Sequence, residues 1–281
     1  MRELDTAVVT EQVARLFVEA NTQLGEDIVS TFQSCLKSET SPTGRDVLTQ
    51  LLQNAELARA TGVPLCQDTG LAVVFLEIGQ DLHLVGGDLY AAVHAGVRTG
   101  CAEGYLRASV VSPPVGKRVN TGDNTPAIIH ATIVPGERLR VVVAPKGGGS
   151  ENTSAIKMLR PADGRVGVKR FVIDTVAAAG PNPCPPIVVG VGIGGTFERC
   201  ALLAKQALLR TLGEPHPEPD FAALEGELLE AINRLGTGPA GLGGNVTALA
   251  VHVETAPCHI ASLPVAVNIN CHSHRHKEAL L

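Results

Sequence analysis

The stretch from Thr175 to Phe197 constrains the fold more than any other part of the sequence. It holds 23 consecutive uncharged residues, but four prolines and five glycines interrupt it. It cannot be a membrane-spanning helix, because its backbone groups would be left unsatisfied in lipid. The prolines of segment 181–186 exclude a helix there, and the apolar run from Ile187 to Val191 predicts a strand. Helical spacing on both sides predicts a helix before this strand and another after it.

Helix-type and strand-type patterns interleave along the rest of the chain. Apolar residues recur at helical spacing near the N-terminus, and the third of the helices expected there should end at Gly62. An apolar run predicts a strand over 71–78. Two runs within 128–144, separated by a Pro-Gly turn, predict a hairpin or a pair of neighbouring strands. Two late strands are expected over 246–253 and 264–270.

The order of these elements favours an α+β fold, with mixed β-sheets flanked by helices. A doubly wound sheet would need a cleaner strand-helix-strand alternation. With 281 residues and 44% hydrophobic composition, the chain is long enough for a sizeable core, and we expect a single large domain over residues 1–281. The proline-spaced segment 213–219 is the best candidate for a hinge or a surface loop.

Charge and the N-terminal residues restrict the partners. The chain has 23 Lys and Arg against 28 Asp and Glu, a formal net charge of -5, so it lacks the basic excess of nucleic-acid-binding proteins. Acidic residues stand within the first five positions, and no apolar segment with a small-residue cleavage site follows, so we expect no secretory signal. A cytoplasmic protein without a membrane partner is predicted.

Two motifs suggest other classes of protein. Gly190 to Gly195 satisfies G-x-G-x-x-G after a strand and before a helix, but the helix leads into a proline-rich loop rather than a second buried strand. We therefore interpret the glycines as close strand-helix packing. The tail Cys271–His276 is dense in Cys and His, yet its spacing fits no regular zinc finger, and alternating histidines at a strand end are more typical of a solvated edge. A zinc-binding structural or interaction module stays as the alternative.

Three of the seven cysteines share a context. Cys35 and Cys200 lie at helical spacing among apolar neighbours and are interpreted as core residues, whereas Cys66, Cys184 and Cys271 each stand on a connection at the end of a predicted strand. Three such thiols could hold one metal centre. A four-iron cluster normally takes four cysteines, so three would leave one iron open to substrate.

Two further features suit an anionic substrate. The segment Lys146–Ser150 provides successive backbone N–H groups beside a cation and can form an anion-binding nest, although such a glycine run is also common in ordinary loops. Arg107 can bind a carboxylate through two parallel hydrogen bonds. A lone arginine is, however, more often a surface residue without such a role.

Together these segments resemble class I iron-sulfur fumarate and tartrate hydro-lyases. The likeness covers nearly the whole chain and is similar to the separate α subunit of the two-subunit form. It rests on CQDTG at 66–70, VNTG at 119–122, the Lys146–Ser150 loop, CPP at 184–186 with the following glycines, and the segment 264–274.

The resemblance implies a 4Fe-4S cluster with one iron lacking a protein ligand. Its ligands would be Cys66, Cys184 and Cys271, the last chosen over Cys258, which falls where relatives can carry arginine. The resemblance also implies five substrate-binding residues, which are Gln67, Asp68, Arg107, Gly148 and His259. Without the family likeness, His259 would be interpreted as a packed histidine.

The implied reaction is the reversible hydration of fumarate to L-malate, a carbon-oxygen lyase activity of the tricarboxylic acid cycle. The segment 147–152 favours fumarate, and L-tartrate dehydration is the alternative. In relatives the proton-transfer residues lie in the C-terminal part or in a separate β subunit, and the sequence ends at Leu281 without them. The resemblance therefore implies a hetero-oligomer in which the α chain alone is inactive.

Overall fold

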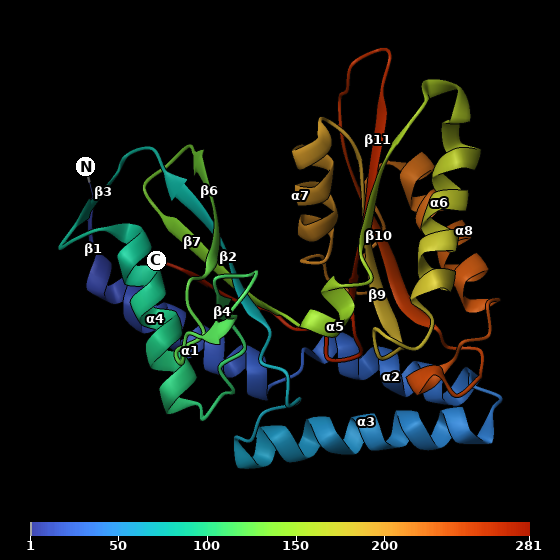
Figure 1. Ribbon diagram of the computed structural model, residues 1–281, viewed down its shortest axis with the longest axis horizontal. Helices are drawn as coiled ribbons and strands as arrows, with labels where there is room; N and C mark the ends of the chain where they lie inside the picture. The colour runs from blue at the N-terminus through green and yellow to red at the C-terminus, as the bar shows by residue number, and fades with distance from the viewer. Residues whose placement is uncertain (1) are drawn as a thin grey trace. The chain divides into compact units, whose positions relative to one another are not determined.

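The computed structural model describes residues 2–281, which form two compact units (Figure 1). Of the described residues, the first unit contains 2–25, 54–148 and 275–281, and the second contains 26–53 and 149–274. The chain passes from one unit to the other four times, so neither unit is a continuous segment. Each unit combines helices with a mixed sheet, which confirms the α+β class. The single domain over residues 1–281 stays a prediction.

The first unit is built on a four-stranded sheet of order β12-β7-β2-β6. Strand β6 runs parallel to β2, and β7 pairs antiparallel with both β2 and β12. A short parallel pair β1-β3 and a short antiparallel pair β4-β5 complete it. Its elements are β1 (Arg2–Asp5), α1 (Thr6–Thr22), β2 (Leu71–Gly79), β3 (Leu82–Val85), α4 (Leu89–Glu103), β4 (Val111–Ser112), β5 (Val119–Asn120), β6 (Ile128–Val134), β7 (Leu139–Lys146) and β12 (Lys277–Leu280). The helix α3 (Pro42–Thr61) begins in the second unit and ends in the first, followed by Gly62 as predicted.

Strand β2 is the centre of this sheet because its side chains are apolar on both faces. Alternate residues Val74 and Leu76 pack with Val13 of α1 and Val97 of α4 in one hydrophobic core. The predicted strand over 71–78 is confirmed. The predicted pairing of the two strands within 128–144 is wrong, since β6 and β7 lie on opposite sides of β2. The most apolar strand takes the inner position and separates two strands that are neighbours in sequence.

The second unit has a four-stranded sheet of order β10-β9-β11-β8. Strands β9 and β10 are parallel, while β11 runs antiparallel to β9 and β8. The strands expected over 187–191, 246–253 and 264–270 are all present. The elements are α2 (Glu26–Ser38), α5 (Gly148–Glu151), β8 (Ala155–Leu159), α6 (Gly164–Ala179), β9 (Ile187–Gly194), α7 (Phe197–Ala207), α8 (Pro219–Asn233), β10 (Ala248–Ala256) and β11 (Leu263–Asn270).

Helices cover both faces of this second sheet, with α6 and α8 on one side and α7 on the other (Figure 1). Side chains from α6 and α8 pack on Val189 and Val191 of β9. The glycines that alternate with these valines, Gly190 and Gly192, face α7. A Cβ atom at Gly190 would lie 2.1 Å from the Ala204 carbonyl oxygen, and one at Gly192 would lie 2.0 Å from that of Cys200. The glycine motif therefore serves close strand-helix packing, as predicted.

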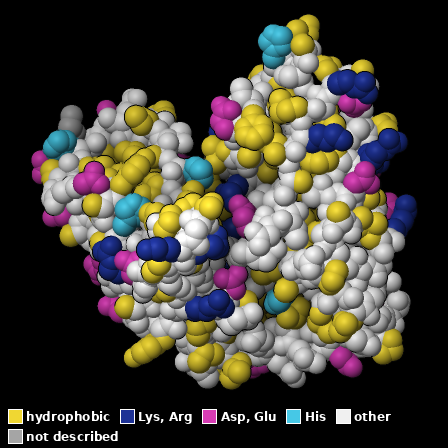
Figure 2. All heavy atoms as spheres, in the orientation of Figure 1, with side chains coloured by type: hydrophobic (Ala, Val, Ile, Leu, Met, Phe, Trp, Pro, Cys, Tyr) yellow, Lys and Arg dark blue, Asp and Glu magenta, His cyan; other side chains and the backbone are white. Residues whose placement is uncertain are grey.

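Segment 213–219 is a loop between α7 and α8, entirely inside the second unit. His216 within it is buried, and its backbone N–H donates to Glu225 at 2.9 Å. The segment is therefore a surface loop held by a buried hydrogen bond, and it does not lie at a point where the chain passes from one unit to the other. None of the helices within residues 2–281 is long and apolar enough to cross a bilayer. On the face shown in Figure 2, basic and acidic side chains of the described residues are intermixed.

His252 of β10 is a buried polar group in the second unit. Its side chain is 2% exposed, and neither ring nitrogen has a hydrogen-bond partner among the described residues. Burial, followed by the positive charge of Arg210, lowers the pKa of His252 from 6.5 to about 4. The imidazole is therefore neutral in the folded protein at neutral pH.

We predict that Gly192→Ala destabilises the protein by about 3 kcal/mol, because the new methyl group would displace backbone of α7. Thermal or denaturant unfolding measures this change. Gly226 lies within α8, and a Cβ atom there would have nothing within 4 Å. Gly226→Ala is the matched control, and it should stabilise the protein by about 0.5–1 kcal/mol. Equal effects of the two substitutions would contradict the packing interpretation.

A second prediction concerns acid stability. Below pH 6.5 the unfolded chain protonates His252 while the folded protein resists protonation until about pH 4, so stability falls with pH across this window. Wild type should lose about 2 kcal/mol between pH 8 and pH 5 that His252→Leu does not lose. Chemical unfolding at both pH values tests this, with the exposed His83→Gln as control. Parallel losses in wild type and His252→Leu would refute it.

Candidate functional site

Cys66 lies in the loop of the first unit that connects α3 to β2. Its side chain is half-buried, and the backbone N–H of Asp68 donates to Cys66 Sγ at 3.4 Å. An N–H group directed at a sulfur stabilises thiolate, the form that binds iron. The side-chain oxygen of Gln67 lies 3.4 Å from the same sulfur. The local geometry therefore suits Cys66 as a metal ligand.

The structure brings together Asp68 and Gly148, both predicted substrate residues. The Asp68 carboxylate accepts the backbone N–H of Gly70 at 3.0 Å and that of Gly148 at 2.8 Å. Gly148 begins the single helical turn α5, so the predicted anion-binding nest directs an N–H at an internal carboxylate. The glycine loop can thus bind a carboxylate.

Two residues that the sequence analysis did not assign hold this loop in place. Arg275 is buried and donates from Nη2 to the carbonyl oxygen of Asp68 at 2.6 Å. Asn124 is fully buried, donating from Nδ2 to Gly70 O at 3.0 Å and accepting the N–H of Ser109 at 2.8 Å. Asn124 has φ +60°, a backbone conformation in which asparagine is enriched. The Asp-Asn-Thr-Pro sequence around it was the one available signal.

Arg107 is exposed in the connection between α4 and β4 of the first unit. It lies two residues before Ser109, so Asn124 links the segment of Arg107 to the loop of Cys66. An exposed guanidinium can form two hydrogen bonds with a carboxylate. Its role in substrate binding stays a prediction.

Cys184 and Cys271 lie at the same end of the second sheet. Cys184 precedes β9, Cys271 follows β11, and the antiparallel pairing of these strands brings the two connections together. His272 donates its backbone N–H to the Cys184 carbonyl oxygen at 3.2 Å, and its Nδ1 lies 3.1 Å from the same oxygen. All seven cysteines carry thiols rather than disulfides. The second unit therefore offers two thiols on hydrogen-bonded connections, and the first offers Cys66.

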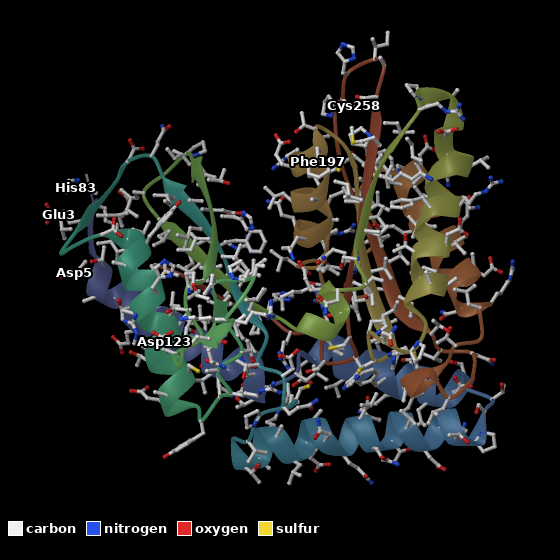
Figure 3. The ribbon with its side chains drawn as sticks, in the orientation of Figure 1. Glu3, Asp5, His83, Asp123, Phe197 and Cys258 are labelled. Atoms are coloured by element: carbon white, nitrogen blue, oxygen red, sulfur yellow. The ribbon has the colours of Figure 1, made fainter. Side chains whose placement is uncertain are left out.

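Cys258 and His259 lie at the other end of the same sheet, in the turn between β10 and β11. Both are exposed, and Figure 3 labels Cys258 there, beside the start of α7 at Phe197. The eight residues of β11 separate them from Cys271, a distance of about 25 Å along the strand. Cys258 therefore lies far from Cys184 and Cys271, and the choice of Cys271 as a ligand stays a prediction. Within this unit His259 is not brought to the cysteine pair, and its assignment rests on the resemblance alone.

The interpretation of the tail after Cys271 as a solvated edge is wrong. Ser273, His274 and Arg275 are buried, and His274 Nδ1 lies 2.7 Å from Asn270 Nδ2. The histidines are engaged in separate polar contacts because the chain turns inward after β11. Within residues 2–281 no three His, Cys, Asp or Glu side chains form a metal-binding group, neither in this tail nor among the predicted cysteine ligands.

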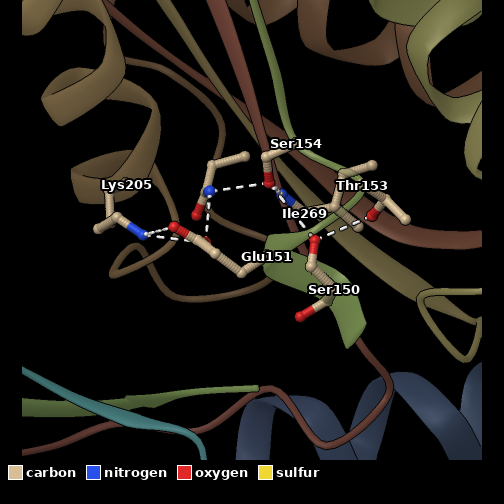
Figure 4. Close-up of polar contacts among 7 residues, drawn as sticks. Ser150, Glu151, Thr153, Ser154, Lys205 and Ile269 are labelled. Atoms are coloured by element: carbon tan, nitrogen blue, oxygen red, sulfur yellow. Dashed lines mark hydrogen bonds and ion pairs between the residues drawn. The ribbon is translucent and has the colours of Figure 1, made fainter. Parts of the chain in front are cut away.

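A polar network anchors the end of the glycine loop in the second unit (Figure 4). Lys205 of α7 pairs with both carboxylate oxygens of Glu151, at 2.9 and 3.1 Å. Asn268 of β11 donates to Glu151 and to Ser154 Oγ, each at 2.9 Å. The network explains why a charged residue, Glu151, stands two positions after the glycine run. It ties the turn α5 to a helix and a strand.

Comparison with known proteins gives one family over almost the whole chain. The sequence model described as fumarate hydratase (fumerase) matches residues 10–280. A protein of Methanocaldococcus jannaschii, provisionally named L(+)-tartrate dehydratase subunit alpha, is 44% identical over 271 residues, 95% of each chain. The L(+)-tartrate dehydratase subunits alpha of Escherichia coli K12 and Shigella sonnei are each 34% identical, over 95% of this chain and 88% of theirs.

We predict that Asn124→Ala costs about 3 kcal/mol of stability and loosens residues 66–70. The substitution leaves buried partners unsatisfied and places alanine at positive φ. Denaturant unfolding and hydrogen exchange of the loop measure both effects. Asn120 also bridges two backbone groups, Ala108 O at 2.9 Å and Gly122 N at 2.8 Å, but is exposed. Asn120→Ala should cost about 1 kcal/mol or less. A loop unchanged in Asn124→Ala would contradict the assignment.

Proposed function

Because this chain belongs to the fumarate hydratase (fumerase) family, we propose that it is the α subunit of an iron-sulfur hydro-lyase acting on a hydroxy-dicarboxylic acid. The observation that carries the proposal is the pair of connections at one end of the second sheet, where a backbone hydrogen bond joins the loops of Cys184 and Cys271. The relatives' names, which specify an alpha subunit, support a β-subunit partner.

The proposed cofactor is a 4Fe-4S cluster held by Cys66, Cys184 and Cys271. Two observations support this cofactor: all three residues are free thiols on short connections, and the Asp68 N–H faces the Cys66 sulfur. When bound, a cluster with three cysteine ligands supplies one open iron as a Lewis acid for the substrate hydroxyl and carboxylate.

The chain's own residues would bind and orient the substrate. Arg107 would pair with one carboxylate through its exposed guanidinium. Gly148 would offer its backbone N–H, which the Asp68 carboxylate accepts in this structure, and Gln67 would hydrogen-bond the hydroxyl. In this arrangement a substrate carboxylate competes with Asp68 for the same N–H. Proton removal from the neighbouring carbon is assigned to the β subunit.

Two substrates are proposed in order. The names of the relatives favour L(+)-tartrate as the first substrate. The segment 147–152 favours fumarate, so the order proposed here is the reverse of the order expected from that segment. Fumarate with L-malate is the second candidate, supported by the description of the matching family. L(+)-tartrate and L-malate are both four-carbon dicarboxylates that lose water between adjacent carbons, so the same binding groups serve either.

The deciding experiment reconstitutes the chain anaerobically with iron and sulfide. Wild type should hold about four iron and four sulfide per chain, as a brown protein. Cys66→Ala, Cys184→Ala and Cys271→Ala should lose the cluster, and Cys258→Ala should keep it. Turnover of L(+)-tartrate and L-malate is then compared for the α chain alone and with its β subunit. We expect activity only in the complex, with tartrate preferred.

Several outcomes would contradict the proposal or part of it. A colourless protein with one zinc would support a zinc module instead. Retention of the cluster in Cys271→Ala would reject that ligand. Activity of the α chain alone would reject dependence on the β subunit, and a preference for L-malate would restore fumarate as the first substrate.

A further inference from the structure

Glu39, directly after α2, is a buried carboxylate in the second unit. Its side chain is 2% exposed, and it accepts the backbone N–H groups of Ser41 at 2.8 Å, Asn245 at 2.9 Å and Val246 at 2.9 Å. Burial by itself raises the pKa of a carboxyl, but these backbone donors bring the pKa of Glu39 below its ordinary value. The residue is therefore a charged anchor for the turn 238–246.

The same turn contacts the segment of Cys184 on both sides of the cysteine. Ala240 donates its N–H to the Pro185 carbonyl oxygen at 2.8 Å. Gly241 packs against Pro181 so closely that a Cβ atom on Gly241 would lie 2.3 Å from the Pro181 Cβ. The backbone groups that bind Glu39 thus belong to the same turn, 238–246, as the residues that contact Pro181 and Pro185.

Cys184 needs such support because its backbone is strained. Its φ is +54°, in the left-handed region that side-chain-bearing residues rarely adopt. A residue stays there only when its surroundings determine it. The Cys184 N–H donates to Pro181 O at 3.0 Å, and the Cys184 carbonyl oxygen accepts from His272 on one side. The turn 238–246 supplies the support on the other side.

We propose that Glu39 is a positioning residue for Cys184: its carboxylate fixes the turn 238–246, which holds the segment 181–186 and so sets the direction of the Cys184 thiol. The ligand role of Cys184 rests on the proposed function. The coupling from Glu39 to Cys184 does not, because it is a property of the chain without cofactor.

The experiment compares Glu39→Gln with Glu225→Gln in the full chain. Glu225 is also a buried carboxylate, accepting Val253 N at 2.8 Å and His216 N at 2.9 Å and pairing with Arg210. Val253 pairs with Val191, toward the end of β9 remote from Cys184. Both variants lose charge at a buried carboxylate, but only Glu39 is connected to the cysteine.

The first readout is the alkylation rate of each cysteine by iodoacetamide in the protein without cluster, followed by mass spectrometry. Glu39→Gln should change the rate at Cys184 at least about twofold, because the exposed thiol loses its fixed direction and so its surroundings change. The exposed Cys258 serves as an internal reference and should keep its rate. Glu225→Gln should change neither rate. Should Glu39→Gln not fold, Glu39→Asp should give a smaller change in the same direction.

The second readout is iron per folded chain after reconstitution, with the electron paramagnetic resonance signal of the cluster. Glu39→Gln should hold less iron than Glu225→Gln of equal stability. An unchanged Cys184 rate in Glu39→Gln and Glu39→Asp overturns the inference, even where the wild type binds a cluster. A changed Cys184 rate in a chain whose wild type binds no iron upholds the positioning and overturns the proposed ligand role.

Discussion

The backbone hydrogen bond from His272 to Cys184 is the interaction on which the proposed metal ligands of the second unit depend. It joins the connection before β9 to the one after β11, and its donor is the residue that follows Cys271. The Cys184 carbonyl oxygen that accepts this bond also lies near Nδ1 of the His272 ring. The two loops are therefore joined at this one oxygen atom. The two connections that carry Cys184 and Cys271 are held together in this way.

The order of the strands makes that bond possible. Because β11 lies antiparallel to β9, the end of one strand lies at the start of the other, whereas the parallel β10 ends at the opposite side of the sheet. Cys258, which follows β10, therefore lies far from Cys184 and Cys271 in space. This holds although Cys258 is closer to Cys271 in sequence than Cys184 is. Strand direction, rather than distance along the chain, selects which cysteines meet.

Polar anchors around both loops follow one principle. A loop that presents a thiol or an N–H group cannot rely on apolar packing, so buried side chains satisfy its backbone. Asn124 and Arg275 do this for the loop of Cys66, and Glu39 does it for the turn beside Cys184. These anchors come from distant parts of the sequence within each unit. Such anchors fix the backbone that carries the proposed ligands before any cofactor binds.

Local patterns were enough to predict much of this protein. The strand over 71–78, the helix end at Gly62 and the packing role of the glycines around Gly192 depend on side chains near in sequence, and each is confirmed. The segments that carry the family resemblance are equally local, because a cysteine followed by Gln-Asp-Thr-Gly is recognisable without a structure. The α+β class followed from the order of these elements.

The sequence by itself determined the types of the elements, the family and the cysteines to consider. Tertiary structure alone decided that β2 separates β6 from β7, that Ser273–Arg275 are buried and that Glu39 supports the segment of Cys184. The physical reason is the range of the interactions. Periodicity and turn chemistry act over a few residues, whereas strand pairing, burial and buried hydrogen bonds join residues up to about 200 positions apart, such as Glu39 and Val246.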